Sequence, residues 1–293
     1  MNDAERPSHV RGSLVGLVLL IVAFVAVAYA AGPAPAGTPP DGEELVLVET
    51  REIGAYRVET WATPRDGWAR ESTVRVVPPE GDPFEVHDAI VRFVEQDGLE
   101  PWEPHSVRYA PGDDLTGDGV PNLLIEGYSL GAHCCFTYHL LSLGETLEVV
   151  WAADTRDSGI MLVDLKGDGE RQFLLADMTF AYEFCSFADS PAPTVVLRIG
   201  SEGVTIANAD HREAYDRTLM TALAGALEDT GEAPDVHRCR VAQLVLQLLY
   251  AGYDSVAEAA LERLYLGDDV SGFRAALWAR ADASPWYRPQ RER

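Results

Sequence analysis

The sequence predicts a mainly β protein with a helical C-terminal part, which is an α+β fold class. Between residues 44 and 208, short apolar runs are separated by turn signals at the spacing typical of a sandwich, barrel or propeller. Past Ala209 the apolar residues change to helical spacing. In addition, the segment that begins at Asp114 returns 50 residues later at Asp164. A repeat of this period indicates stacked structural units.

Residues 1–31 are expected to be a signal anchor or a signal peptide. Residues 14–31 carry no charge and no proline, and as a helix they would extend about 27 Å, close to the hydrocarbon core of about 30 Å. Arg6 and Arg11 precede this run, which places the N-terminus inside. A signal-peptidase motif ends at Ala30, so a retained single-pass anchor and a cleaved signal both remain open. Either one places the rest of the chain outside the cytoplasm.

The β part is expected at residues 44–208, after a Pro/Gly linker at residues 32–43. Gly54 separates the first two strands, as in a hairpin. Residues 85–94 fit either a strand or a short helix. The runs 123–125 and 173–175 are continuously apolar, which indicates strands buried on both faces. The other expected strands are 45–48, 56–61, 72–77, 136–143, 146–151, 194–199 and 204–207.

The helical part is expected at residues 209–285, followed by a tail at 286–293. Apolar residues from Val241 to Leu249 recur at i, i+3, i+4, i+7 and i+8, which is one face of a helix. Ser255 and Glu258 have the spacing of a capping box that opens the next helix. Two further helices are expected at 211–227 and 270–279.

The charge and the cysteines limit the classes of partner and compartment. The chain has 47 acidic and 23 basic residues and a net charge of −24, which argues against nucleic acid as a partner. The four cysteines, Cys134, Cys135, Cys185 and Cys239, would form disulfides outside the cytoplasm. Their connectivity is open, but adjacent Cα atoms, about 3.8 Å apart, disfavour a bridge between the first two. We expect one long-range bridge that uses Cys185.

The loop that begins at Asp114 has the oxygen spacing of a calcium site. Oxygen donors at positions 1, 3, 5, 7 and 9 come from Asp114, Thr116, Asp118, the Val120 carbonyl and Asn122. Position 12 is Ile125 rather than a bidentate glutamate, so a strand follows and the loop is not an EF-hand. We expect Ca²⁺ here, with a structural role. The alternative is an Asp/Gly turn that binds no ion.

This loop, Asp-Leu-Thr-Gly-Asp-Gly-Val-Pro-Asn at 114–122, resembles the D-x-N-G-D-G-x-x-D loop of FG-GAP/VCBS repeats. These repeats are the calcium-binding blades of integrin-α-like β-propellers. The resemblance implies propeller-blade-like antiparallel β repeats, with calcium on Asp114, Thr116, Asp118 and Asn122. Thr116 replaces the Asn of the family pattern and Asn122 replaces its last Asp; both keep an oxygen, but the second change removes a charge, so weak binding is expected.

The second copy departs further from the pattern. Lys166 and Gln172 stand at positions 3 and 9. An ammonium group cannot ligate a cation, so no metal is expected at residues 164–172, and Lys166 is expected to act as a counter-ion between Asp164 and Asp168. Two repeats are too few for a closed propeller, which predicts an incomplete or degenerate one.

Two other segments carry side chains of chemical interest. His133, Cys134, Cys135 and His139 fit a zinc or copper site, or a Cys/His nucleophile, but disulfide use is favoured in an oxidising compartment. A strand at 179–187 would place Phe180, Tyr182 and Phe184 on one side. Such a row serves as a stacking platform for sugars or peptides, or as core.

The sequence therefore predicts an exported, membrane-tethered or secreted, calcium-stabilised β-repeat protein that acts as a binding, recognition or envelope module. Its partner is expected to be a protein or a carbohydrate, and it contacts the membrane if its N-terminal helix is uncleaved. We assign no catalytic residue. The alternative is a secreted hydrolase with a site near His133 and the strand Phe180–Phe187.

Overall fold

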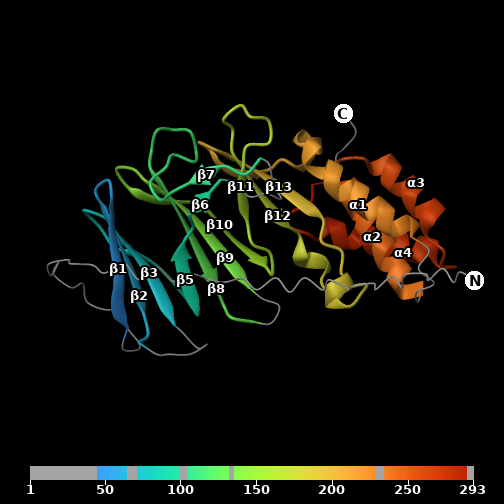
Figure 1. Ribbon diagram of the computed structural model, residues 1–293, viewed down its shortest axis with the longest axis horizontal. Coiled ribbons are helices and arrows are strands. Elements are labelled where there is room, and N and C mark those ends of the chain that lie inside the picture. The colour runs from blue at the N-terminus through green and yellow to red at the C-terminus, as the bar shows by residue number, and fades with distance from the viewer. Residues whose placement is uncertain (1–44, 65–70, 99–104, 132–134, 229–233, 289–293) are drawn as a thin grey trace, which may run out of the picture. The chain divides into compact units, whose positions relative to one another are not determined.

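The computed structural model describes residues 45–64, 71–98, 105–131, 135–228 and 234–288 (Figure 1). The chain divides into two units, 1–37 and 38–293, and every described residue belongs to the second unit. The predictions for residues 1–31 and 32–43 lie outside the described residues. Within the described ranges, no helix is both long enough and apolar enough to cross a membrane.

The described residues form three four-stranded antiparallel sheets, one two-stranded sheet and four α-helices. The chain is thus mainly β with a helical C-terminal part, as predicted. The N-terminal sheet is a meander in the order β1-β2-β3-β4. Its strands are β1 (Val46–Ile53), β2 (Tyr56–Ala62), β3 (Ser72–Val77) and β4 (Phe84–Asp88). Gly54, at φ 60°, makes the predicted hairpin turn between β1 and β2.

The middle sheet has the order β10-β9-β8-β5, in which the neighbours β8 and β5 are not consecutive in the chain. Its members are β5 (Ile90–Phe93), β8 (Asn122–Tyr128), β9 (Phe136–Leu143) and β10 (Leu147–Arg156). Between β5 and β8 the chain makes a separate pair, β6 (Gln96–Asp97) and β7 (Arg108–Tyr109). The ambiguous segment 85–94 is thus two strands, β4 and β5.

The C-terminal sheet is again a meander, in the order β11-β12-β13-β14. Its strands are β11 (Met161–Val163), β12 (Gln172–Ala176), β13 (Thr194–Gly200) and β14 (Gly203–Ile206). Two 3₁₀ turns, η1 (Met178–Phe180) and η2 (Phe187–Asp189), lie between β12 and β13. Two more, η3 (Asn208–Asp210) and η4 (Arg212–Tyr215), lead into the helices.

The four helices follow at the predicted places, in orange to red in Figure 1. They are α1 (Asp216–Leu227), α2 (Pro234–Tyr250), α3 (Asp254–Leu264) and α4 (Val270–Asp282). The capping-box prediction is wrong, because α3 begins at Asp254 and its N-cap, Tyr253, makes no side-chain cap bond. Ser255 is therefore already inside the helix.

Strand β8 connects two hydrophobic cores. Leu123 and Ile125 belong to a cluster with residues of the N-terminal sheet, such as Val74. Leu124, which points to the opposite face because side chains alternate along a strand, belongs to a second cluster with the C-terminal sheet and the helices. All three side chains are at most 1% exposed. This confirms the prediction that residues 123–125 are buried on both faces.

A buried carboxylate links the helices to the end of β12. Asp177 is fully buried and accepts hydrogen bonds from the hydroxyl groups of Tyr250 and Ser284. It also accepts one from the Thr179 N–H, at 2.8 Å. Burial, together with the adjacent Asp177 carboxylate, raises the pKa of Tyr250, so that its hydroxyl remains a donor. A buried carboxylate is tolerated only when it is bonded in this way.

Candidate cation site and ligand-binding cavity

The two Asp-Gly loops occupy equivalent places in two sheets. Loop one (114–122) leads into β8, which pairs antiparallel with β5 and β9. Loop two (164–172) leads into β12, which pairs antiparallel with β11 and β13. The two similar sequence segments therefore precede the second strand, in chain order, of their respective sheets, β8 or β12.

In loop one, the carboxylate of Asp114 organises the backbone. Its Oδ1 accepts from the Gly117 N–H at 2.6 Å and its Oδ2 from the Gly119 N–H at 2.8 Å. Both glycines have positive φ, 75° and 83°, which an L side chain rarely adopts. Asp118 Oδ1 accepts from the Val120 N–H at 2.9 Å. The Asp-x-x-Gly-x-Gly spacing thus encodes a closed turn.

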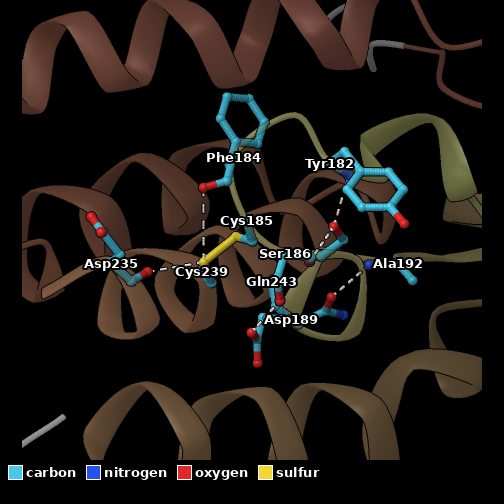
Figure 2. Close-up of a disulfide and its surroundings, with 10 residues drawn as sticks. Tyr182, Phe184, Cys185, Ser186, Asp189, Ala192, Asp235, Cys239 and Gln243 are labelled. Carbon is cyan, nitrogen blue, oxygen red and sulfur yellow. Dashed lines mark hydrogen bonds between the residues drawn. A yellow bond between two sulfur atoms is a disulfide. The ribbon is translucent and has the colours of Figure 1, made fainter. Parts of the chain in front are cut away.

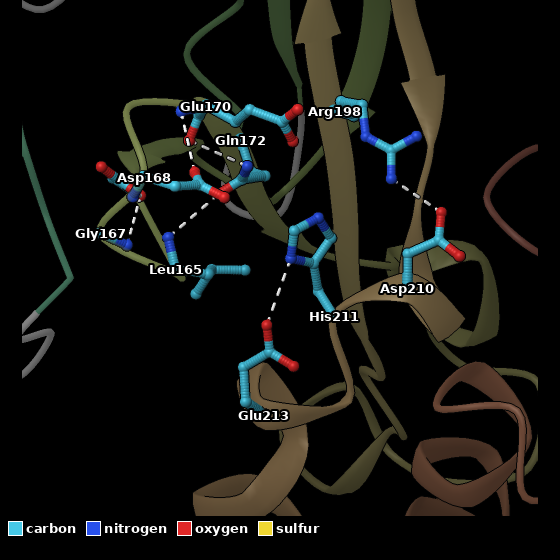
Figure 3. Close-up of polar contacts among 10 residues, drawn as sticks. Leu165, Gly167, Asp168, Glu170, Gln172, Arg198, Asp210, His211 and Glu213 are labelled. Carbon is cyan, nitrogen blue, oxygen red and sulfur yellow. Dashed lines mark hydrogen bonds and ion pairs between the residues drawn. The ribbon is translucent and has the colours of Figure 1, made fainter.

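Loop two has the same hydrogen-bond pattern (Figure 3). Asp164 Oδ1 accepts from the Gly167 N–H at 2.7 Å and its Oδ2 from the Gly169 N–H at 2.9 Å. Asp168 Oδ1 accepts from the Glu170 N–H at 3.0 Å. The two aspartates of each loop therefore have a structural role that does not depend on the residue at position 3.

Position 9 fixes the loop to the strand. The Asn122 side chain is fully buried, and its Oδ1 accepts from the Leu115 N–H at 2.7 Å and from the Thr116 N–H at 3.1 Å. The Thr116 hydroxyl, also buried, donates to the same oxygen at 3.3 Å. Gln172 Oε1 accepts from the Leu165 N–H at 3.1 Å in loop two (Figure 3). The side-chain oxygens of Thr116 and Asn122 thus face the inside of the loop.

A cation at this loop would be held by the Asp114 and Asp118 carboxylates, three of whose four oxygens already accept hydrogen bonds from backbone N–H groups of the loop. Calcium takes six to eight oxygen ligands, so water would have to supply most of its coordination here. Within the described ranges, no group of three or more His, Cys, Asp and Glu side chains is placed to hold a metal. The donor set of loop one therefore fits a weak, largely hydrated Ca²⁺ site rather than a tight one.

Lys166 does not take the counter-ion position expected for it. Its side chain is exposed, and among the described residues it makes no ion pair with a carboxylate. Asp164 and Asp168 are satisfied by backbone N–H groups instead. The lysine still leaves loop two without an oxygen at position 3.

The predicted strand at 179–187 is wrong, because residues 178–189 contain two 3₁₀ turns. Asp177 caps the first turn through the Thr179 N–H, and the turns direct the three aromatic rings apart. Phe180 is fully buried against Tyr250, at 6.4 Å between ring centroids. Phe184 packs edge-on against Phe273 at 5.6 Å. Tyr182 alone of the three is exposed, at 62%.

Cys185 forms a disulfide with Cys239 of α2, with a Cα–Cα distance of 6.0 Å (Figure 2). This confirms the long-range bridge that uses Cys185. Cys135 is disulfide-bonded too, whereas His133 and Cys134 lie outside the described residues. The sulfur of Cys135 is therefore neither a thiolate ligand nor a nucleophile.

His139 lies on β9, half-buried, with its ring edge-on to Phe84 at 5.7 Å between centroids. Its Nδ1 is buried and has no hydrogen-bond partner among the described atoms. Desolvation by burial lowers the pKa of His139. A neutral imidazole packed on Phe84 has the surroundings of a core side chain.

Two cavities flank the segment 178–192. One, of about 640 Å³, lies between this segment and α1 and α2, next to the disulfide. The other, of about 260 Å³, is lined by Tyr182 and Phe187 on this segment and by Asp154, Arg156 and Asp157 at the end of β10. The sequence did not identify the three β10 residues, because an Asp/Arg turn carries no signal of what packs against it.

No protein-family model matches the chain, and no solved structure matches it. A curated protein of Sinorhizobium fredii (strain NBRC 101917 / NGR234), named "Uncharacterized protein y4bJ", is 28% identical over 103 residues. The match covers 34% of this chain and 16% of that protein's length. The resemblance to FG-GAP/VCBS repeats therefore rests on the loop residues.

Proposed function

We propose that the chain is an exported binding module built of propeller-blade-like sheets, in which loop one holds a weak, stabilising Ca²⁺. The equivalent positions of the two loops, each at the entry to the second strand of a four-stranded sheet, carry this proposal. Loop one presents the Asp114 and Asp118 carboxylates and the Val120 carbonyl. Extracellular calcium modules work at about 10⁻⁴–10⁻³ M, where such a donor set is sufficient.

Export is supported by the Cys185–Cys239 disulfide, because disulfides persist in oxidising compartments. Recognition is favoured over hydrolysis because the alternative site required a reactive group near His133. Of the cysteines at that alternative site, the structure describes Cys135, which is disulfide-bonded. His139 of the same site packs on Phe84. The partner proposed for the module is a protein or a carbohydrate.

The calcium proposal is tested by melting the protein with and without a chelator. At free calcium ten times its Kd, binding to the folded state adds about 1.4 kcal/mol, which raises the Tm by about 3–5 °C. We expect EDTA to remove this increment from the wild type, and Asp118→Ala to abolish the sensitivity to EDTA.

The matched control is Asp168→Ala. It removes the equivalent hydrogen bond, to the Glu170 N–H, so it should lower the Tm about as much as Asp118→Ala but leave the response to EDTA unchanged. Lys166→Asn removes the positive charge from position 3 of loop two, between Asp164 and Asp168 in the sequence, and should add one calcium per chain in titration calorimetry. A wild-type Tm that does not respond to calcium would contradict the proposed calcium site.

A further inference from the structure

Three non-glycine residues in the described part of the chain have left-handed backbone: Leu130 at φ 57°, Arg156 at φ 57° and Tyr182 at φ 64°. Such conformations cost of order 1–3 kcal/mol each and cluster at ligand-binding sites. Arg156 and Tyr182 both line the 260 Å³ cavity. Leu130 adjoins Ser129, which exchanges two hydrogen bonds with Cys135. Cys135 also lines the cavity. The strain is therefore concentrated around one cavity.

The cavity presents an exposed aromatic ring on a fixed loop. Tyr182 is 62% exposed and stands next to Phe187, with 5.4 Å between their ring centroids. The Tyr182 N–H donates to Ser190 Oγ at 2.9 Å, and the disulfide of Cys185 ties the same loop to α2 (Figure 2). A ring held in place before binding loses little conformational entropy when a ligand stacks on it.

The polar groups of the cavity include both acceptors and a donor. Asp154 Oδ1 accepts from the Arg156 N–H at 2.7 Å, and the Arg156 guanidinium donates to the Met178 carbonyl at 3.3 Å. Asp157 lines the same wall. The two carboxylates accept hydrogen bonds, whereas the guanidinium donates them. A hydroxyl group does both, so a neutral polyol can bond to each of these groups.

The charges favour a neutral ligand over a cation or a polyanion. The positive charge of the Arg156 guanidinium would repel a cation bound by Asp154 and Asp157. The net charge of the whole chain, −24, would repel a polyanionic ligand. The small volume, about 260 Å³, suits one ring rather than a folded peptide segment.

We propose that this cavity binds one ring of a neutral, hexose-containing glycan, with a face of the ring stacked on Tyr182 and its hydroxyl groups bonded to Arg156 and Asp157. This assignment rests on the proposed binding function and names its ligand class. The cavity lies at the end of β10 and beyond the end of β12, whereas the Asp-Gly loops lie at the starts of β8 and β12. Glycan binding and calcium binding are therefore separable.

The test applies the full chain to a microarray of neutral oligosaccharides of glucose, mannose and galactose. The best-bound oligosaccharide is then titrated by calorimetry. We expect Tyr182→Ala to weaken its affinity about tenfold or more. Tyr182→Phe should retain the affinity, because the stacking face is kept. The control, Met220→Ala, removes a side chain that is 68% exposed on α1 and should bind as the wild type does.

No wild-type binding to any neutral oligosaccharide, or an affinity of Tyr182→Ala within twofold of the wild type, overturns the assignment. If the protein instead binds a peptide array and Tyr182→Ala loses that binding, the sugar assignment fails while the binding function stands. Asp118→Ala should keep its oligosaccharide affinity. A failed calcium test therefore leaves the glycan result interpretable.

Discussion

Single side chains in this protein show how one pattern of residues serves two purposes. The Asp-x-x-Gly-x-Gly spacing indicated a cation, and the structure shows the same aspartates holding backbone N–H groups of glycines in both loops. Asn122, expected as a ligand, bonds to the backbone of its own loop. Its role was not visible in the sequence, because an amide oxygen fits an ion and an N–H equally well.

At the residue scale, His139 gives a prediction of pH dependence. Burial lowers its pKa in the folded state below the ordinary value of about 6.5. The folded state then binds protons less readily than the unfolded state. The contribution to stability is therefore present above about pH 6.5 and is lost as the pH falls through the lower, folded-state pKa.

Urea denaturation of the wild type and of His139→Gln from pH 8 to pH 5 tests this prediction. The free energy of unfolding of the wild type should fall more steeply than that of the variant on the acidic side of pH 6.5. Parallel curves for the two proteins over that range would contradict it.

At the element scale, strands with a clear pattern were predicted well. β3 and β9 have the predicted bounds, 72–77 and 136–143, because their apolar residues and flanking turns leave few alternatives. The segment 178–189 was mispredicted, because the strand propensity of its aromatic residues is outweighed by the Asp177 cap and by the disulfide at Cys185. The cap is local, since it joins residues two apart, whereas the disulfide partner of Cys185 lies 54 residues away and leaves no local pattern.

The cavity between the end of β10 and residues 178–187 was also beyond sequence reasoning. It depends on the pairing of Arg156 with Phe136, which positions the end of β10. It also depends on the turn that exposes Tyr182. The sequence placed Tyr182 in one row with Phe180 and Phe184, as a stacking platform or as core, whereas the structure exposes Tyr182 and packs the other two rings inside.

The Cys185–Cys239 disulfide gives an element-scale prediction. It closes a loop with a sequence separation of 54, and the chain-entropy relation gives about 4 kcal/mol of stabilisation for that length. The double variant Cys185→Ser/Cys239→Ser should lose roughly this free energy of unfolding. A dithiol reductant should lower the Tm of the wild type more than that of the variant, which keeps only the disulfide of Cys135. Equal responses of the two proteins would contradict the prediction.

At the scale of the whole molecule, β8 belongs to both hydrophobic cores, so we expect the sheets and helices to unfold together. Leu123 faces the N-terminal sheet and its neighbour Leu124 faces the core shared with the helices. Leu123→Ala and Leu124→Ala should each lower the free energy of unfolding by about 2–5 kcal/mol.

Circular dichroism at 222 nm, which follows the helices, tests this cooperativity. The midpoint should shift for Leu123→Ala as well as for Leu124→Ala, although Leu123 is not part of the helical core. A helix signal that Leu123→Ala leaves unchanged would show that the N-terminal sheet unfolds on its own.

The strand order of the middle sheet also determines when the chain can finish folding as it is synthesised. The N-terminal sheet needs only local pairs, so its four strands can assemble once Asp88 has emerged. Its apolar face is covered by β8 and β9, however, which extend to Leu143. Contacts of such sequence separation form slowly. During synthesis, the stretch between residues 88 and 143 therefore leaves an interval in which an apolar sheet face is uncovered.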